Sequence, residues 1–187
     1  LKLPEGLSVQ EVVRAGVGIA KEAGSKYVAL DVGPLGQILA PVGSFHFDQA
    51  YEIFAEQMRA GEAAGADCIL LETFSDLYEA KIAILAAKEN TALPVFCTMT
   101  FQQDGRTFMG TDPLPMVVAL CDMGIDAIGV NCSLGPEELM PVVESILELS
   151  PLPAMVQANA GLPALEDGKT VYPLSDEAIC LHGRRTL

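Results

Sequence analysis

The sequence predicts an α/β fold built from repeated βα units. Three observations support this class. Five short apolar runs recur along the 187 residues, and longer segments with helical periodicity separate them. Successive runs start roughly 28 to 40 residues apart, which is the spacing of βα units. Two architectures use such units, the doubly wound open sheet and the closed (β/α)8 barrel. A complete barrel needs about 250 residues, so a barrel formed by this chain would be incomplete.

The five apolar runs are rich in aliphatic and β-branched residues. Continuous runs of this length are typical of strands in a parallel sheet that is covered on both faces. We therefore expect the strands to be buried on both sides. The runs are Tyr27–Val32, Ala66–Thr73, Val95–Phe101, Asp126–Cys132 and Ala154–Asn159.

Helix start signals precede the segments that flank these runs. Such signals include capping residues, acidic residues in the first turn and proline near the first helical position. They are a capping-box pattern at Ser8–Glu11, Asp48 before an apolar stripe that ends near Gly61 and Gly65, Asp76 before residues 77–90, Pro113 and Pro136 in the first turns of two more helices, and Ser175 before a last helical segment.

The composition excludes several classes of protein. The formal net charge is −14, from Lys+Arg 11 and Asp+Glu 25. A nucleic-acid binder needs a basic footprint, and an acidic chain is also poorly suited to an anionic membrane surface. No apolar stretch approaches the roughly 18 residues of a membrane span, and no signal peptide opens the chain. We expect no nucleic-acid partner and no membrane association.

The cysteines and histidines bear on compartment and metal binding. The five cysteines are odd in number and dispersed, which predicts reduced, buried thiols in a cytoplasmic protein and no disulfide framework. His46 and His182 are too few and too far apart for a histidine-based metal cluster. The chain also lacks the glycine-rich motifs that hold nucleotide phosphates.

Polar residues end several of the predicted strands. They are Glu72 and Thr73, Thr98 and Thr100, Asn131 and Cys132, and Asn159. Any one of them could serve only a loop or a cap, but together they favour a shared site, because the carboxyl ends of parallel strands meet at one face. Glu72 follows Leu70-Leu71, where a carboxylate needs a cationic or hydrogen-bonding partner. Cys132 fits either a small buried hydrophobe or a functional thiol.

These strand ends resemble those of the homocysteine S-methyltransferase family, particularly the homocysteine-binding domain of cobalamin-dependent methionine synthase. The segments that carry the resemblance follow the order and spacing of the family over nearly the whole chain. They are Asp31–Gly36, Leu70–Asp76, Thr98–Phe101, Gly129–Pro136 and Gln157–Pro163. The resemblance implies an α/β fold of the (β/α)8 TIM-barrel type, incomplete, with about five of eight strands present in a single partial domain over residues 1–187.

The resemblance also implies a set of site residues. Cys132 looks like the first of three zinc cysteines, and the homocysteine sulfur would be a further zinc ligand. Glu72 looks like the carboxylate that receives the amino group of homocysteine, with Thr73 beside it. Asn131 and Asn159 look like substrate-binding residues of the same pocket. A free thiol has a pKa of about 8.5 and is mostly protonated at neutral pH. Zinc would convert the thiol of homocysteine into a thiolate.

The chain departs from the family at its ends. The adjacent cysteine pair that completes the zinc site in the family is absent, and Cys180, in an expected helix, is a poor substitute. The opening strand of the family is absent too, and Leu1 indicates that the natural start lies upstream. We expect one of three zinc ligands here, and a chain that on its own binds zinc weakly and is inactive.

The implied function is methyl transfer to the zinc-activated thiol of homocysteine, giving methionine, by an enzyme that is incomplete in this chain. The methyl donor implied by the closest resemblance is methylcobalamin carried by another domain, whereas S-methylmethionine or betaine serves other branches. The alternative is a non-catalytic barrel fragment that acts as a binding or assembly piece through its open sheet edges. An unrelated open-sheet enzyme is the third hypothesis.

Overall fold

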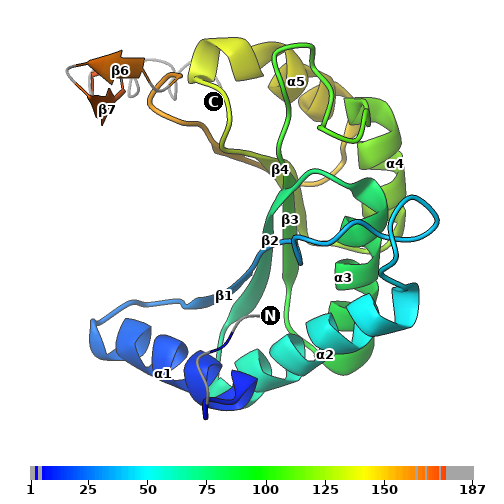
Figure 1. The fold of residues 1–187 in the computed structure, drawn as a ribbon, viewed down its shortest axis with the longest axis vertical. Coiled ribbons are helices and arrows are strands. Elements are labelled where there is room, and N and C mark those ends of the chain that lie inside the picture. The colour runs from blue at the N-terminus through cyan, green and yellow to red at the C-terminus, as the bar shows by residue number, and fades with distance from the viewer. Residues whose placement is uncertain (1–2, 4–5, 163, 167, 173, 176–187) are drawn as a thin grey trace.

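A computed structural model describes residues 3, 6–162, 164–166, 168–172 and 174–175 of the chain (Figure 1). Strands and helices alternate through most of this part, as the repeated apolar runs predict. In chain order the elements are α1 (Val9–Glu22), β1 (Ala29–Val32), α2 (Phe47–Ala64), β2 (Cys68–Phe74), α3 (Leu77–Asn90), β3 (Val95–Met99), α4 (Pro113–Asp122), β4 (Ala127–Asn131), α5 (Pro136–Leu149), β5 (Ala154–Gln157), β6 (Ala164–Glu166) and β7 (Lys169–Val171).

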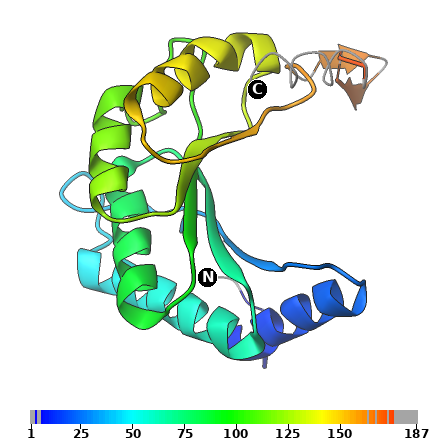
Figure 2. The same ribbon diagram turned by 180° about the vertical axis from the view of Figure 1, so that it is seen from behind.

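The main sheet contains five parallel strands in the order β1-β2-β3-β4-β5. Each strand pairs with the next one along the chain, which is the strand order of a (β/α)8 barrel and not of a doubly wound sheet. The sheet curves into an open arc whose convex side carries the helices (Figures 1 and 2). The predicted incomplete barrel is thus confirmed, with five barrel strands among the described residues where a closed barrel has eight.

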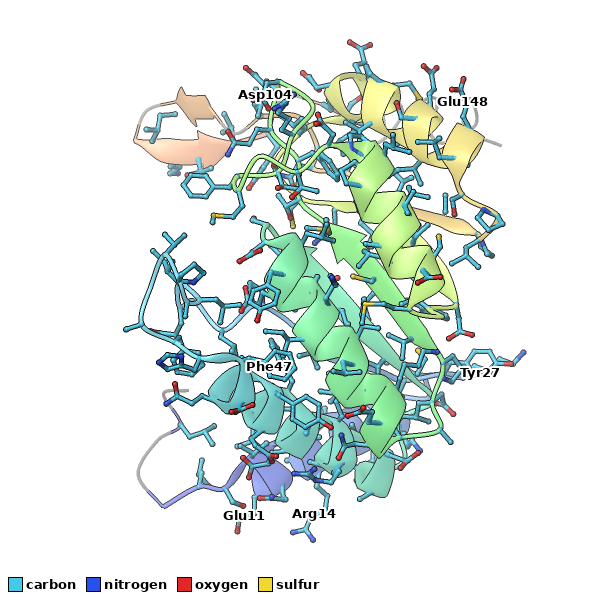
Figure 3. All side chains as sticks on the ribbon, turned by 90° about the vertical axis from the view of Figure 1, so that its right-hand side faces the viewer. Glu11, Arg14, Tyr27, Phe47, Asp104 and Glu148 are labelled. Carbon is cyan, nitrogen blue, oxygen red and sulfur yellow. The ribbon has the colours of Figure 1, made fainter. Side chains whose placement is uncertain are left out.

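The convex face of the sheet holds the core. Alternate strand residues on this side are fully or almost fully buried under the helices, which lie in front of the sheet in Figure 3. Phe54 of α2, for example, packs against Phe74 of β2 with ring centroids 6.1 Å apart. The buried residues of this face are Leu30, Val32, Ile69, Leu71, Val95, Cys97, Met99, Ile128 and Val130.

The concave face differs from the prediction that both sides of the strands are buried. On this face Ala29 and Asp31 of β1 are exposed, and Cys68 and Leu70 of β2 are half-buried. No described helix covers this side (Figures 1 and 2). In a closed barrel these side chains would pack against those of the opposite strands, and the open arc of described strands does not bring that opposite wall into place.

The helix starts follow the sequence signals closely. Ser8 and Glu11 form the expected capping box at α1, and the side chain of Asp76 accepts the N–H of Tyr78 at the start of α3. The start of α2 was misplaced by the sequence argument, because exposed His46 is the N-cap and Asp48 lies within the first turn. Gly65 ends that helix with φ 85°, a left-handed conformation that suits glycine.

Two features near the carboxyl end lie beyond the prediction. β6 and β7 form a small antiparallel hairpin that the sequence argument did not include. The helix predicted to follow Ser175, with Cys180 and His182, lies outside the described residues.

In the part of the chain that the structure describes, no helix is long and apolar enough to cross a membrane.

Candidate functional site

The predicted site residues lie at the carboxyl ends of β2, β4 and β5. Hydrogen bonds link these three strand ends into one cluster. Thr73 of β2 donates its backbone N–H to Asn131 of β4 at 3.0 Å, and the N–H of Cys132 donates to the carbonyl of Gln157 in β5, also at 3.0 Å. Just after β5, the N–H of Asn159 donates to the carbonyl of Leu134 at 3.0 Å. The cluster that parallel strands were expected to form at one face is therefore present.

Asn131 is the buried centre of the cluster, with 1% of its surface exposed. Its Oδ1 atom accepts hydrogen bonds from the Thr73 N–H and from the Thr98 hydroxyl, each at 3.0 Å. The Thr100 hydroxyl lies at 3.5 Å from the same oxygen. The Nδ2 atom of Asn131 donates to Thr73 Oγ1 at 2.7 Å and to Cys132 Sγ at 3.4 Å. A buried amide is stable only when its polar atoms are paired, and here both are.

Three residues of the cluster adopt left-handed backbone conformations that are uncommon outside glycine. They are Thr73 with φ 68°, Cys132 with φ 58° and Ser133 with φ 58°. For a β-branched residue such as Thr73 this conformation is a genuine outlier. Hydrogen bonds secure all three, since Ser133 Oγ donates to the carbonyl of Phe101 at 2.6 Å and the other two are held as described above. Strain of this kind gathers at functional sites.

Glu72 lies on the concave face beside a second acid. Burial and the nearby charge of Asp31 raise the pKa of Glu72, while a hydrogen bond from the side chain of Gln157 opposes that rise. Loss of hydration also raises the pKa of Asp31. The hydrogen-bonding partner that the sequence argument required for Glu72 is thus Gln157 of β5, with β3 and β4 lying between the two strands. Both acids disfavour a second negative charge and favour a positively charged group.

Sequence reasoning missed the pairing of Asp31 with Glu72 and the role of Gln157. No sequence signal could have found the proximity of the two acids, because it depends on the strand register: Asp31 pairs with Leu70, and Glu72 follows two residues later on the same face. Gln157 pairs with Asn131 in the adjacent strand. Which strands neighbour one another is not apparent from any one of these segments alone.

Cys132 is half-buried at the carboxyl end of β4, and its thiol lies close to two polar groups. Thr73 Oγ1 lies 4.0 Å from Cys132 Sγ, in addition to the Asn131 amide. The thiol is a suitable donor for zinc, but a zinc site in a protein uses three or four protein ligands. Among the described residues, no group of three histidine, cysteine, aspartate or glutamate side chains could hold a metal ion. The described residues therefore do not form a complete zinc site.

The other described cysteines lie away from the site at the carboxyl ends of the strands. Cys97 points to the convex core, where burial raises the pKa of its thiol to about 12. Cys68 begins β2, at the opposite end of that strand. The Sγ atom of Cys121 in α4 lies 3.7 Å from the Oγ atom of Ser150. Both are only half-buried, which corrects the expectation that these thiols are buried. A segment can be apolar in sequence and still leave its first or last residue near the surface.

The turn after β5 packs closely against the start of α5. Gly161 is buried with φ 89°, and a Cβ atom on Gly135 would lie 3.1 Å from the Cα atom of Gly161. Glycine at both positions allows this approach. The contact keeps the segment that carries Asn159 next to the turn that carries Cys132.

Comparisons with known proteins identify a matching family and similar sequences. The sequence model of a family described as homocysteine S-methyltransferase matches residues 2–183. The methionine synthase of Mycobacterium tuberculosis is 31% identical over 165 residues, and that of Mycobacterium leprae is 29% identical over 159 residues. These matches cover 83% and 82% of this chain but only 14% and 13% of the two relatives.

Solved structures share the fold. The apo form of the homocysteine methyltransferase MmuM from Escherichia coli superimposes with a TM-score of 0.74 at 20% identity, over 85% of this chain and 64% of MmuM. A metallated form of the same protein superimposes with a TM-score of 0.69 at 21% identity, over 83% of this chain and 61% of that one. The chain therefore spans less than two thirds of these proteins.

Proposed function

Because the chain belongs to the homocysteine S-methyltransferase family, we propose that it forms the part of a homocysteine-binding barrel that positions this amino acid for methyl transfer to its sulfur. The product is methionine. In this reaction the thiol of homocysteine loses its proton, and the sulfur forms a bond to the methyl carbon as the bond from that carbon to the donor breaks. The observation that supports the proposal is the cluster of Glu72, Thr73, Asn131, Cys132 and Asn159 at one end of the sheet.

Glu72 is proposed to receive the ammonium group of the amino acid. The ammonium would lie between Glu72 and Asp31, where burial and the charge of Asp31 raise the pKa of Glu72. A cation there relieves the repulsion and gains charge-assisted hydrogen bonds. Thr73 follows Glu72 in β2 and is hydrogen-bonded to Asn131, and we propose that Thr73, Asn131 and Asn159 complete the polar lining of this pocket.

Cys132 is proposed as a zinc ligand, in line with the family and with the metallated form described for MmuM. Its half-buried thiol and the Asn131 amide beside it suit this role. The described residues supply this thiol alone, so we propose that the remaining ligands belong to the complete domain. The chain by itself should hold much less than one tightly bound zinc per molecule. Metal analysis after dialysis measures this, and one zinc per chain retained at nanomolar affinity would contradict it.

The methyl donor we propose is methylcobalamin carried by another domain of the same enzyme. The curated relatives are methionine synthases of which this chain matches 14% and 13%, which leaves most of their length for further domains. We propose a cytoplasmic location, in line with the reduced state expected of the thiols.

The test of substrate binding uses calorimetric titration of the chain with L-homocysteine. We expect Glu72→Gln to weaken binding about tenfold or more, since a hydrogen bond to a charged group contributes about 1.5–3 kcal/mol. Glu148→Gln is the matched control, because Glu148 is exposed on α5, on the helical side of the sheet (Figure 3). Equal affinities of the Glu72→Gln variant and the parent chain would refute the proposed role.

The sheet edges favour one alternative, a non-catalytic assembly piece. Within the described residues, β1 pairs only with β2 and β5 only with β4, so each has one open edge. Open edges invite pairing with another chain. Oligomerisation through these edges without homocysteine binding would favour the alternative, and a monomer that binds homocysteine would exclude it.

A further inference from the structure

A β-bulge interrupts β2 where it reaches the proposed site. Leu71 pairs with Cys97 and Phe74 pairs with Met99, so Glu72 and Thr73 together stand opposite the single residue Thr98. Thr73 takes up the extra length with its left-handed conformation. A bulge of this kind leaves one residue unpaired in the ladder and changes the direction of nearby side chains. The bulge therefore sets the directions of the Glu72 and Thr73 side chains at the carboxyl end of β2.

The N–H left unpaired by this bulge is satisfied from a strand that is not its neighbour. Asn131 belongs to β4, and its side chain reaches past β3 to accept the Thr73 N–H at 3.0 Å. A backbone N–H can only donate, so the atom facing it must be Oδ1 and the amide orientation is determined. Nδ2 then points to Thr73 Oγ1 and Cys132 Sγ, at 2.7 and 3.4 Å.

The same amide thus joins the two left-handed turns of the site. On one side it bonds the backbone and hydroxyl of Thr73, and on the other it bonds the sulfur of Cys132. The Thr98 hydroxyl, fully buried, donates to Oδ1 and fixes the amide from beneath. With 1% of its surface exposed and both polar atoms paired, the side chain of Asn131 acts on its protein neighbours.

We infer that Asn131 is a positioning residue: its amide locks the β2 bulge to the Cys132 turn, so that Glu72, Thr73 and Cys132 face the substrate in one arrangement. Asn131 therefore serves the site through Thr73 and Cys132. The consequence for homocysteine rests on the proposed function, whereas the lock on the bulge does not. The two parts can be tested separately.

Hydrogen exchange of the Thr73 amide measures the lock without any ligand. The amide of Ile69, which donates to the carbonyl of Pro94 at 2.9 Å in the regular part of β2, is the internal reference. In Asn131→Leu we expect Thr73 exchange to accelerate about tenfold or more relative to Ile69, because its acceptor is lost. In Asn131→Asp an acceptor oxygen remains, and we expect the ratio to stay within about threefold of the parent value.

Two further variants keep the test informative. Thr98→Val removes one donor to Oδ1, and a relative acceleration of about threefold is expected even if Asn131→Leu does not fold. Thr107→Val is the control for general destabilisation. Thr107 is also buried, but it accepts the N–H of Thr111 in the loop before α4, so Thr73 and Ile69 should change together. Equal acceleration of Thr73 and Ile69 in both Asn131→Leu and Thr98→Val would overturn the inference.

Calorimetric titration with L-homocysteine tests the consequence for binding. We expect Asn131→Leu to weaken binding about tenfold. Asn131→Asp keeps the acceptor for the Thr73 N–H but loses the donor to Thr73 Oγ1 and Cys132 Sγ, so its loss of affinity should be smaller than that of Asn131→Leu. Unchanged affinity in Asn131→Leu would overturn the positioning role even where exchange shows the lock. If the parent chain does not bind homocysteine, the proposed function fails for this chain, and the exchange ratio alone decides whether Asn131 locks the bulge.

Discussion

The convex and concave faces of the sheet are formed by alternate residues of the same strands, yet they do different work. On the convex face Leu71 and Ile69 are completely buried under helices. On the concave face Leu70 and Glu72, their immediate neighbours in sequence, are half-buried and Asp31 is exposed. The convex face supplies the hydrophobic stability of the fold, whereas the concave face carries polar and strained residues toward its carboxyl end. Because successive residues of a strand point to opposite faces, one strand contributes to stability through one set of alternate residues and to function through the other.

Substitution of adjacent leucines in β2 should show the largest difference between the faces. We expect Leu71→Ala to lower the free energy of unfolding by about 2–5 kcal/mol, because it opens a cavity in a packed core. Leu70→Ala should cost less than about 1.5 kcal/mol, since a half-buried side chain loses less contact. Urea denaturation at constant m-value measures both. Equal losses would show that the concave face is as well packed as the convex face in solution.

The close contact between β4 and β5 offers a second comparison. A Cβ atom on Gly129 would lie 1.8 Å from the carbonyl oxygen of Met155, so Gly129→Ala must move backbone. We expect a loss of about 1–3 kcal/mol from this overpacking. Gly16→Ala is the control in α1, where a Cβ atom would meet nothing within 4 Å, and helix propensity predicts a gain of about 0.5–1 kcal/mol. Thermal unfolding of the two variants should shift in opposite directions.

The pH dependence of stability should reveal the acids of the concave face, with the smallest effect. The pKa of Glu72 is raised in the folded state by burial and by Asp31. The folded state therefore binds the proton more tightly, and the corresponding stability is present below the ordinary Glu pKa of 4.5 and lost as pH rises through the raised pKa. We expect Glu72→Gln to flatten this decline as pH rises above 4.5 in urea titrations.

Ligand binding sharpens the same comparison. An ammonium group between Glu72 and Asp31 would favour their charged forms, so homocysteine should stabilise the parent chain more at neutral pH than at pH 4. The Glu72→Gln variant should lose most of this difference. A parent chain whose stability profile is identical to that of Glu72→Gln would show that Glu72 is hydrated like an ordinary surface acid.

Local sequence patterns determined most of the secondary structure. Residues 77–90 form α3 with Asp76 as N-cap, as predicted, and Ser8 and Glu11 form the predicted capping box. All five apolar runs contain strands, although each strand is shorter than its run or shifted by one or two residues. These features depend on neighbours within a few positions along the chain, so periodicity and capping chemistry are sufficient to find them.

The tertiary structure alone decided how the strand ends act together. The bulge at Thr73 depends on its pairing with β3, and the bond from Thr73 to Asn131 spans 58 residues of sequence. The partnership of Glu72 with Gln157 across the arc, and the exposure of the concave face, depend on sheet curvature. The sequence by itself determined which residues end the strands and which family the chain resembles. Register and curvature are long-range properties, so only the folded chain could decide which of those residues meet.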